Sequence, residues 1–98
     1  MKIKVYQMNV ERDKRRLLFM DYDYTRRYGG VEPEEYDLVF DGEVTAKTLD
    51  EIFTLFNVEE PPKDYHGRNM SVSDVIVCPG GAFFVDDVGF AKLENFNV

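Results

Sequence analysis

The residues best suited to catalysis or ligand binding lie in one polar stretch, from position 64 to position 74. It holds the only histidine of the chain, His66, together with Asp64, Arg68 and Asp74. A histidine oriented by a carboxylate can act as a general base, and an arginine can hold a phosphate or carboxylate through two parallel hydrogen bonds. Three hypotheses follow: a catalytic centre, a binding site, or a loop whose polar groups serve its own structure.

A hydrolytic centre is the weakest of the three hypotheses. Such centres combine a nucleophile with a base, or gather several metal ligands, and one histidine with scattered aspartates has neither spacing. The pair Asp86 and Asp87 lacks the six or so oxygens of a hard-cation loop, so a turn-capping role is the better interpretation. We therefore expect no enzyme activity, no catalytic residue, no metal and no cofactor.

The binding hypothesis makes this polar stretch a contact face, because tyrosine and arginine are favoured at interface hot spots. The structural alternative is that Asp64 and Arg68 fix the loop, while serine hydroxyls and Asp74 satisfy backbone groups of a turn. Both interpretations are open from the sequence. The predicted binding residues are Tyr65, His66, Arg68, Asn69, Ser71, Ser73 and Asp74.

Hydrophobic periodicity predicts the strands that must position this stretch. Residues 2–9 alternate, with Ile3 and Val5 on one face and Gln7 as a candidate for the same face. The short apolar run at 17–20 predicts a strand antiparallel to the first. Further strands are expected at 36–40 (bent or ended by Asp41-Gly42), 75–77, 82–85 and 91–93, with turn residues at 78–81.

The clearest helix is predicted for residues 48–57. Thr48 and Glu51 have capping-box spacing, and one apolar stripe, which must lie on the sheet, is formed by Leu49, Ile52, Phe53 and Phe56. A short helix near 24–28, capped by Asp21 or Asp23, is also expected. Together these elements predict a single α+β domain over residues 1–98: a curved, mostly antiparallel sheet of five to six strands with one main helix packed on it.

Composition sets the class of protein. A chain of 98 residues with 44% hydrophobic content, eight Phe and six Tyr can bury one core. No apolar run approaches the ~18 residues of a membrane span, and the first residues do not resemble a signal peptide. One cysteine forms no internal disulfide, which fits a reducing cytoplasm.

The net charge of −7 is unevenly distributed. Residues 1–30 carry eight Lys and Arg against four Asp and Glu (+4), whereas residues 31–98 carry four against fifteen (−11). An acidic body argues against broad nucleic-acid binding. The basic residues, interleaved with tyrosines that could stack on bases, are Arg12, Lys14, Arg15, Arg16, Arg26 and Arg27. The interpretation we favour is that their stems cover the domain edge.

Two motifs resemble those of the YodL-like domain family. The first runs Tyr65-His66-Gly67-Arg68-Asn69-Met70-Ser71-Val72-Ser73-Asp74-Val75-Ile76, with Asn69 where the family motif has serine. The second runs Phe83-Phe84-Val85-Asp86-Asp87-Val88-Gly89-Phe90. The opening, from Val5 to Lys14, is also similar to small proteins of this group, so the resemblance spans nearly the whole chain.

The resemblance implies an accessory protein of conjugative or other mobile elements of gut Firmicutes, a group that also occurs as modules beside helicases and DNA methylases. It implies no reaction. We therefore expect a cytoplasmic, non-enzymatic domain of a mobile genetic element that binds a protein or nucleoprotein partner through the 64–74 loop. We expect no membrane binding. The alternative is RNA or DNA binding by a small β-barrel of the PUA or ASCH kind, using the N-terminal basic residues and Arg68. A hydrolase centred on His66 is less favoured.

Overall fold

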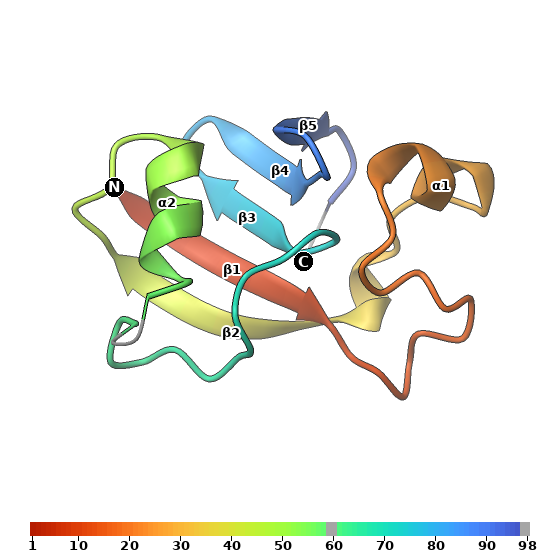
Figure 1. The fold of residues 1–98 in the computed structure, drawn as a ribbon, viewed down its shortest axis with the longest axis horizontal. Helices are drawn as coiled ribbons and strands as arrows, with labels where there is room; N and C mark the ends of the chain where they lie inside the picture. The colour runs from red at the N-terminus through yellow and green to blue at the C-terminus, as the bar shows by residue number, and fades with distance from the viewer. Residues whose placement is uncertain (59–60, 97–98) are drawn as a thin grey trace.

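The computed structural model describes residues 1–58 and 61–96, and these form one five-stranded antiparallel sheet with two helices (Figure 1). This confirms the predicted α+β class and the lower of the two expected strand numbers. The elements in chain order are β1 (Lys2–Met8), α1 (Tyr22–Arg27), a 3-10 turn (Pro33–Glu35), β2 (Tyr36–Glu43), α2 (Leu49–Leu55), β3 (Val75–Cys78), β4 (Gly81–Val85) and β5 (Phe90–Leu93).

The sheet is open. Its strand order is β2-β1-β3-β4-β5, and every neighbouring pair is antiparallel. Because β2 and β5 lie at opposite ends of that order and do not pair with each other, the sheet is not a closed barrel. The expected likeness to a PUA or ASCH barrel is therefore wrong at the level of architecture.

Helix α2 covers one face of the sheet, as its apolar stripe predicted (Figure 1). The fully buried side chains of Ile52 and Phe56 pack in one cluster with Ile3 and Val5 of β1 and with residues of β2 and β3. The Thr48 hydroxyl accepts a hydrogen bond from the Glu51 N–H at 3.1 Å, so the predicted N-cap is confirmed. Gln7 follows Ile3 and Val5 at the same period, which places it at the end of this face.

The other face of the sheet packs against irregular chain and against Tyr22 of α1. Leu17 from the loop at residues 10–20 packs there against the buried aromatic and aliphatic residues Tyr6, Met8, Tyr36, Val75 and Phe84. The ring of Phe96 meets the rings of Tyr6 and Tyr36 edge-on, with centroids 5.2 and 5.5 Å apart. This face therefore depends on the placement of the 10–20 loop.

The strand predicted for residues 17–20 is wrong, because no strand forms there. The Asp13 carboxylate accepts hydrogen bonds from the Leu17 and Leu18 N–H groups at 2.8 and 2.9 Å, which closes a turn. Arg16 and Phe19 have φ angles of 59° and 69°, in the left-handed region that a strand cannot use.

The ends of other elements also differ from the prediction, and the helix predicted for residues 48–57 spans Leu49–Leu55. Helix α1 begins at Tyr22 rather than near 24, with the Asp21 carboxylate accepting a hydrogen bond from the Tyr24 N–H at 2.8 Å. Strand β2 continues through Asp41 and Gly42 to Glu43, because both residues keep their pairing with β1. Asp-Gly is a frequent turn sequence, but here the pairing with β1 overrides that local preference.

Candidate functional site

The 64–74 stretch folds over the end of β1, where it meets the buried side chain of Gln7. Gln7 Nε2 lies 2.9 Å from the Tyr65 hydroxyl, 2.9 Å from the Arg68 carbonyl and 3.0 Å from Asp74 Oδ2. Gln7 Oε1 accepts a hydrogen bond from the Arg68 N–H at 3.1 Å. One amide group, 2% exposed, therefore fixes three separate parts of the loop to the sheet.

Gly67 lets the loop approach that amide. A Cβ atom at this position would lie 2.2 Å from Gln7 Oε1 and 2.9 Å from its Cδ. Such a distance is far below van der Waals contact, and the Gln7 amide cannot withdraw without losing its own hydrogen bonds. The glycine is thus needed for close approach.

Tyr65 links the loop to the α2 face. Its ring meets that of Phe56 edge-on at 4.9 Å, and its hydroxyl also donates to the Arg68 carbonyl. Burial, followed by the nearby charge of Asp74, raises the pKa of the Tyr65 hydroxyl above its usual value. The phenol is therefore kept protonated as a hydrogen-bond donor.

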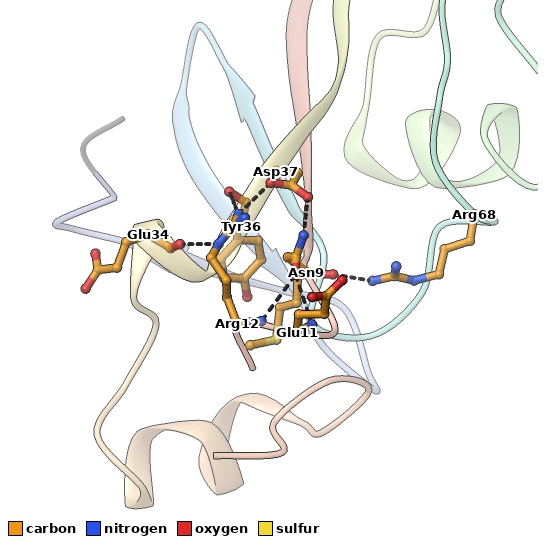
Figure 2. Close-up of polar contacts among 8 residues, drawn as sticks. Asn9, Glu11, Arg12, Glu34, Tyr36, Asp37 and Arg68 are labelled. Carbon is orange, nitrogen blue, oxygen red and sulfur yellow. Dashed lines mark hydrogen bonds and ion pairs between the residues drawn. The ribbon is translucent and has the colours of Figure 1, made fainter. Parts of the chain in front are cut away.

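Arg68 reaches from the 64–74 stretch to the start of the 10–20 loop. Its Nη2 donates to the Met8 carbonyl at 3.0 Å (Figure 2). Its guanidinium carbon lies 5.7 Å from the centroid of the Phe19 ring, a cation–π distance. Its Nε is buried and has no partner in the part of the chain that the structure describes. Arg68 is thus a bridge between two loops.

Asp74 is the most deeply buried acid of the site. Its Oδ2 accepts hydrogen bonds from Gln7 and from the Ser71 N–H, the latter at 3.0 Å. Its Oδ1 and the Ser71 hydroxyl are buried and lack partners among the described residues. Burial raises the pKa of Asp74 to about 7, although the hydrogen bonds from Ser71 and Gln7 act in the opposite direction.

Ser73 faces the other side of the sheet. Its hydroxyl accepts a hydrogen bond from the Phe19 N–H at 3.1 Å, and its carbonyl accepts one from the Tyr36 hydroxyl at 2.7 Å. Burial raises the pKa of the Tyr36 hydroxyl, which therefore stays a donor. Ser73 has a φ of 85°, so a strained residue holds the junction between the 64–74 stretch and the 10–20 loop.

The structure brings together some of the predicted binding residues and separates others. Tyr65, Arg68 and Asp74 contact Gln7, and Ser71 joins them through its hydrogen bond to Asp74. Ser73 turns toward Phe19 and Tyr36 instead. His66 and Asn69 are exposed. Because Asp74 is buried and turned toward Gln7, it does not orient His66 as a catalytic pair would require.

Sequence reasoning missed two residues of this site, Gln7 and Gly67. The signal for Gln7 was its phase, because a polar residue that follows two buried strand positions on the same face is placed where it needs a partner. Nothing local identified Gly67, because its requirement comes from a contact across sixty residues of chain.

Three of the six basic residues make contacts within the chain. Arg12 pairs with the Asp37 carboxylate and donates to the Glu34 carbonyl at 2.9 Å (Figure 2), and its hydrogen bond is the main cause of the lowered pKa of Asp37. Arg15 pairs with Glu35 at 2.6 Å, and the Arg26 guanidinium lies 5.6 Å from the centroid of the Tyr22 ring. The other three basic residues, Lys14, Arg16 and Arg27, are exposed, as Arg12 and Arg26 also are.

The acidic pair between β4 and β5 caps its own turn. Asp86 Oδ1 accepts hydrogen bonds from the Tyr22 and Asp87 N–H groups at 3.1 and 2.9 Å, and Asp87 Oδ1 accepts one from the Val88 N–H at 2.9 Å. Within residues 1–58 and 61–96, no group of three or more His, Cys, Asp or Glu side chains is placed to hold a metal ion.

Fold and site together define a small open-sheet α+β domain whose polar loop is anchored on a buried glutamine. The chain belongs to the YodL-like domain family, whose model matches residues 2–96. This confirms the resemblance carried by the two motifs. No curated protein and no solved structure matches the chain. Neither helix in the described ranges has the length and apolar character needed to cross a membrane.

Proposed function

We propose that this chain is a non-enzymatic interaction domain of a bacterial mobile genetic element, acting in the cytoplasm and binding a protein or nucleoprotein partner through the 64–74 loop. The observation that carries the proposal is the anchoring of an irregular loop by Gln7 while His66 and Asn69 remain exposed. A loop already fixed in one conformation has less ordering entropy to lose when it binds.

The loop residues divide into two roles under this proposal. His66 and Asn69 contact the partner, together with the half-buried Arg68. The residues that hold the loop in place are Tyr65, Ser71, Ser73 and Asp74. This division favours binding over catalysis, because Asp74 accepts its hydrogen bonds from Gln7 and from the Ser71 N–H and is not directed at His66.

The proposed mobile-element origin and cytoplasmic location are supported by the sequence alone. The two motifs resemble proteins of conjugative and other mobile elements, and a single unpaired cysteine, Cys78, suits a reducing compartment.

A second candidate function is contact with RNA or DNA. It is favoured by the exposed cations Lys14, Arg16 and Arg27 and by the neighbouring rings of Tyr24 and Tyr28, whose centroids are 4.8 Å apart. Phosphate contacts weaken steeply as salt rises. Binding of a single-stranded oligonucleotide that falls by several-fold between about 50 and 200 mM salt would favour this candidate.

The experiment for the main proposal compares affinity captures from a lysate of a bacterium that carries the gene. The wild type is compared with the double variant His66→Ala/Asn69→Ala, and with Glu94→Ala/Asn95→Ala, a matched change of two exposed polar residues elsewhere. We expect the first double variant alone to lose the captured protein, with unchanged thermal unfolding. Equal capture by all three proteins, with nuclease-treated lysate, would reject the loop as the contact face.

A further inference from the structure

The 10–20 loop displays large apolar side chains instead of burying them. Val10, Phe19 and Met20 are 68%, 54% and 38% exposed, although Leu17 in the same loop is only 1% exposed. Together with Leu18 they line one hollow of about 600 Å³ that Lys14 and Arg16 also border. Exposed apolar side chains that gather around one hollow, rather than standing singly, mark a contact surface.

The backbone conformation of the 10–20 loop keeps these apolar side chains exposed. The left-handed φ angles at Arg16 and Phe19 are unusual for long side chains, and hydrogen bonds at both ends impose them. Asp13 holds the Leu17 and Leu18 N–H groups, and Ser73 holds the Phe19 N–H. The exposure of Phe19 is therefore set by a fixed backbone. Strain of this kind persists where the surrounding structure enforces it and is common at functional positions.

The free charge around the hollow is positive. Lys14 and Arg16 are exposed, and the Arg68 guanidinium lies over the Phe19 ring. The two acids that line the hollow are Glu11 and Asp13, so the five charged side chains, three cations and two acids, sum to +1. Residues 31–98 carry −11, so an acidic partner is repelled by most of the molecule and attracted here.

We propose that this surface binds an acidic amphipathic peptide segment of a protein partner. Apolar side chains of the peptide enter the hollow, and its carboxylates face Lys14, Arg16 and Arg68. A peptide fits better than a nucleic acid because three of the four apolar lining residues are not aromatic, whereas bases stack on aromatic faces. The surface shares only Arg68 with the 64–74 loop and does not depend on that loop having a partner. Its residues are Val10, Lys14, Arg16, Leu18, Phe19 and Met20, with Arg68 at its border.

The test titrates the isotope-labelled full chain with a synthetic peptide that repeats glutamate, leucine and phenylalanine, and follows backbone amide shifts by NMR. Two control peptides replace either every glutamate by lysine or every apolar residue by serine. We expect amide shifts centred on residues 10–20, and binding of both control peptides at least about tenfold weaker than that of the acidic peptide. Equal binding of all three peptides, or shifts centred elsewhere, would overturn the proposal.

Variants give a second, independent readout. Phe19→Asn/Met20→Ser should abolish peptide binding without unfolding the loop, because asparagine tolerates the left-handed region. Val88→Ser changes a side chain that is 87% exposed on a different turn, and should leave binding unchanged. Arg16→Glu should weaken binding of the acidic peptide and strengthen binding of the lysine peptide.

Other occupants of the surface are outcomes of the same test. If a single-stranded oligonucleotide bound at residues 10–20 and the acidic peptide did not, the occupant of the surface would be a nucleic acid and the peptide proposal would be wrong. Concentration-dependent dimerisation that Phe19→Asn abolishes would make the occupant a second copy of the chain. His66→Ala/Asn69→Ala should leave peptide binding intact, so failure of this proposal and failure of the proposed function are distinguishable.

Discussion

The two long irregular connections, the 10–20 loop and the 64–74 loop, are fixed by the same physical means but turn opposite residues to solvent. Each is held by side chains that pair with backbone groups: Asp13 and Ser73 in the first case, Gln7 in the second. The 64–74 loop buries polar atoms around Gln7, whereas the 10–20 loop exposes apolar ones around Phe19.

The difference shows where stability and binding reside in this domain. A buried polar network contributes to the fold only when its members are paired, so loss of one member leaves several others unsatisfied. An exposed apolar side chain contributes little to the fold, so its loss is tolerated. Mutations in the 64–74 interior should therefore affect stability, and those on the 10–20 surface should affect binding. Ser73 and Arg68 connect the two loops.

The largest expected effect is that of Gln7→Ala. It leaves the Arg68 N–H without its acceptor, and an unpaired buried group costs about 1–3 kcal/mol. It also removes one of two hydrogen bonds from the Arg68 carbonyl and from Asp74 Oδ2, which keep the Tyr65 hydroxyl and the Ser71 N–H as donors. Urea unfolding should show a loss of about 3–5 kcal/mol in the free energy of unfolding. Hydrogen exchange should rise first in the 64–74 loop and not in the 10–20 loop.

Gly67→Ala is a matched test of the same contact, because the added methyl group would displace the Gln7 amide. It should reproduce the exchange pattern of Gln7→Ala. Asn9→Ala, two residues further along the chain, removes contacts to Asp37 and to the Glu11 N–H instead and should leave the 64–74 loop protected. If Gln7→Ala were no more destabilising than Asn9→Ala, the proposed role of Gln7 as anchor would be wrong.

The next effect concerns pH. The folded state raises the pKa of Asp74 from 3.8 to about 7, so between these values the folded chain binds a proton that the unfolded chain has released. Stability from this group is therefore fully present below about pH 4 and is lost as pH rises to about 7, by up to about 4 kcal/mol. Urea unfolding at pH 5 and pH 8 should show the lower stability at pH 8.

Asp74→Asn isolates that contribution. Asparagine can place its oxygen toward Gln7 and Ser71, where Asp74 Oδ2 accepts its hydrogen bonds, and cannot ionise. We expect the variant to unfold with a much smaller difference between pH 5 and pH 8, and to be the more stable protein at pH 8. An unchanged pH profile would show that other carboxylates cause the dependence.

A smaller effect is expected at the junction of the two loops. Ser73→Ala removes the acceptor of the Phe19 N–H and should cost about 1–2 kcal/mol. Ser71→Ala is the control, because its hydroxyl is buried without a partner among the described residues, and its loss should change stability by less than about 0.5 kcal/mol. In Ser73→Ala, exchange of the Phe19 amide should rise.

Elements set by local pattern were predictable from the sequence. The alternation in β1 and β2 and the capped apolar stripe of α2 are visible within a few residues, and both were confirmed. The strand predicted from the apolar run at 17–20 was wrong, because a hydrophobic pattern does not reveal the hydrogen bonds of Asp13 or the left-handed φ of Phe19. Short apolar runs carry no information about which members face solvent.

The candidate site was predictable only in part. The motif around His66 identified the loop, and the alternative that its polar groups serve the loop itself describes Arg68, Ser73 and Asp74 well. The partner that Arg68 and Asp74 share could not be predicted, because Gln7 lies sixty residues away and pairs with the loop only through the tertiary fold. Long-range polar contacts of this kind leave no periodic signal in a single sequence.

The smallest expected effect on stability is that of Phe19→Asn. The substitution removes a half-exposed ring, which loses some apolar contact with Arg68, and it relieves a left-handed conformation that asparagine adopts more readily. The two changes oppose each other, so the free energy of unfolding should move by no more than about 0.5 kcal/mol. A loss of about 2 kcal/mol or more in urea unfolding would show that Phe19 is part of the core. The 10–20 loop would then stabilise the fold as the 64–74 loop does, and the contrast between them would fail.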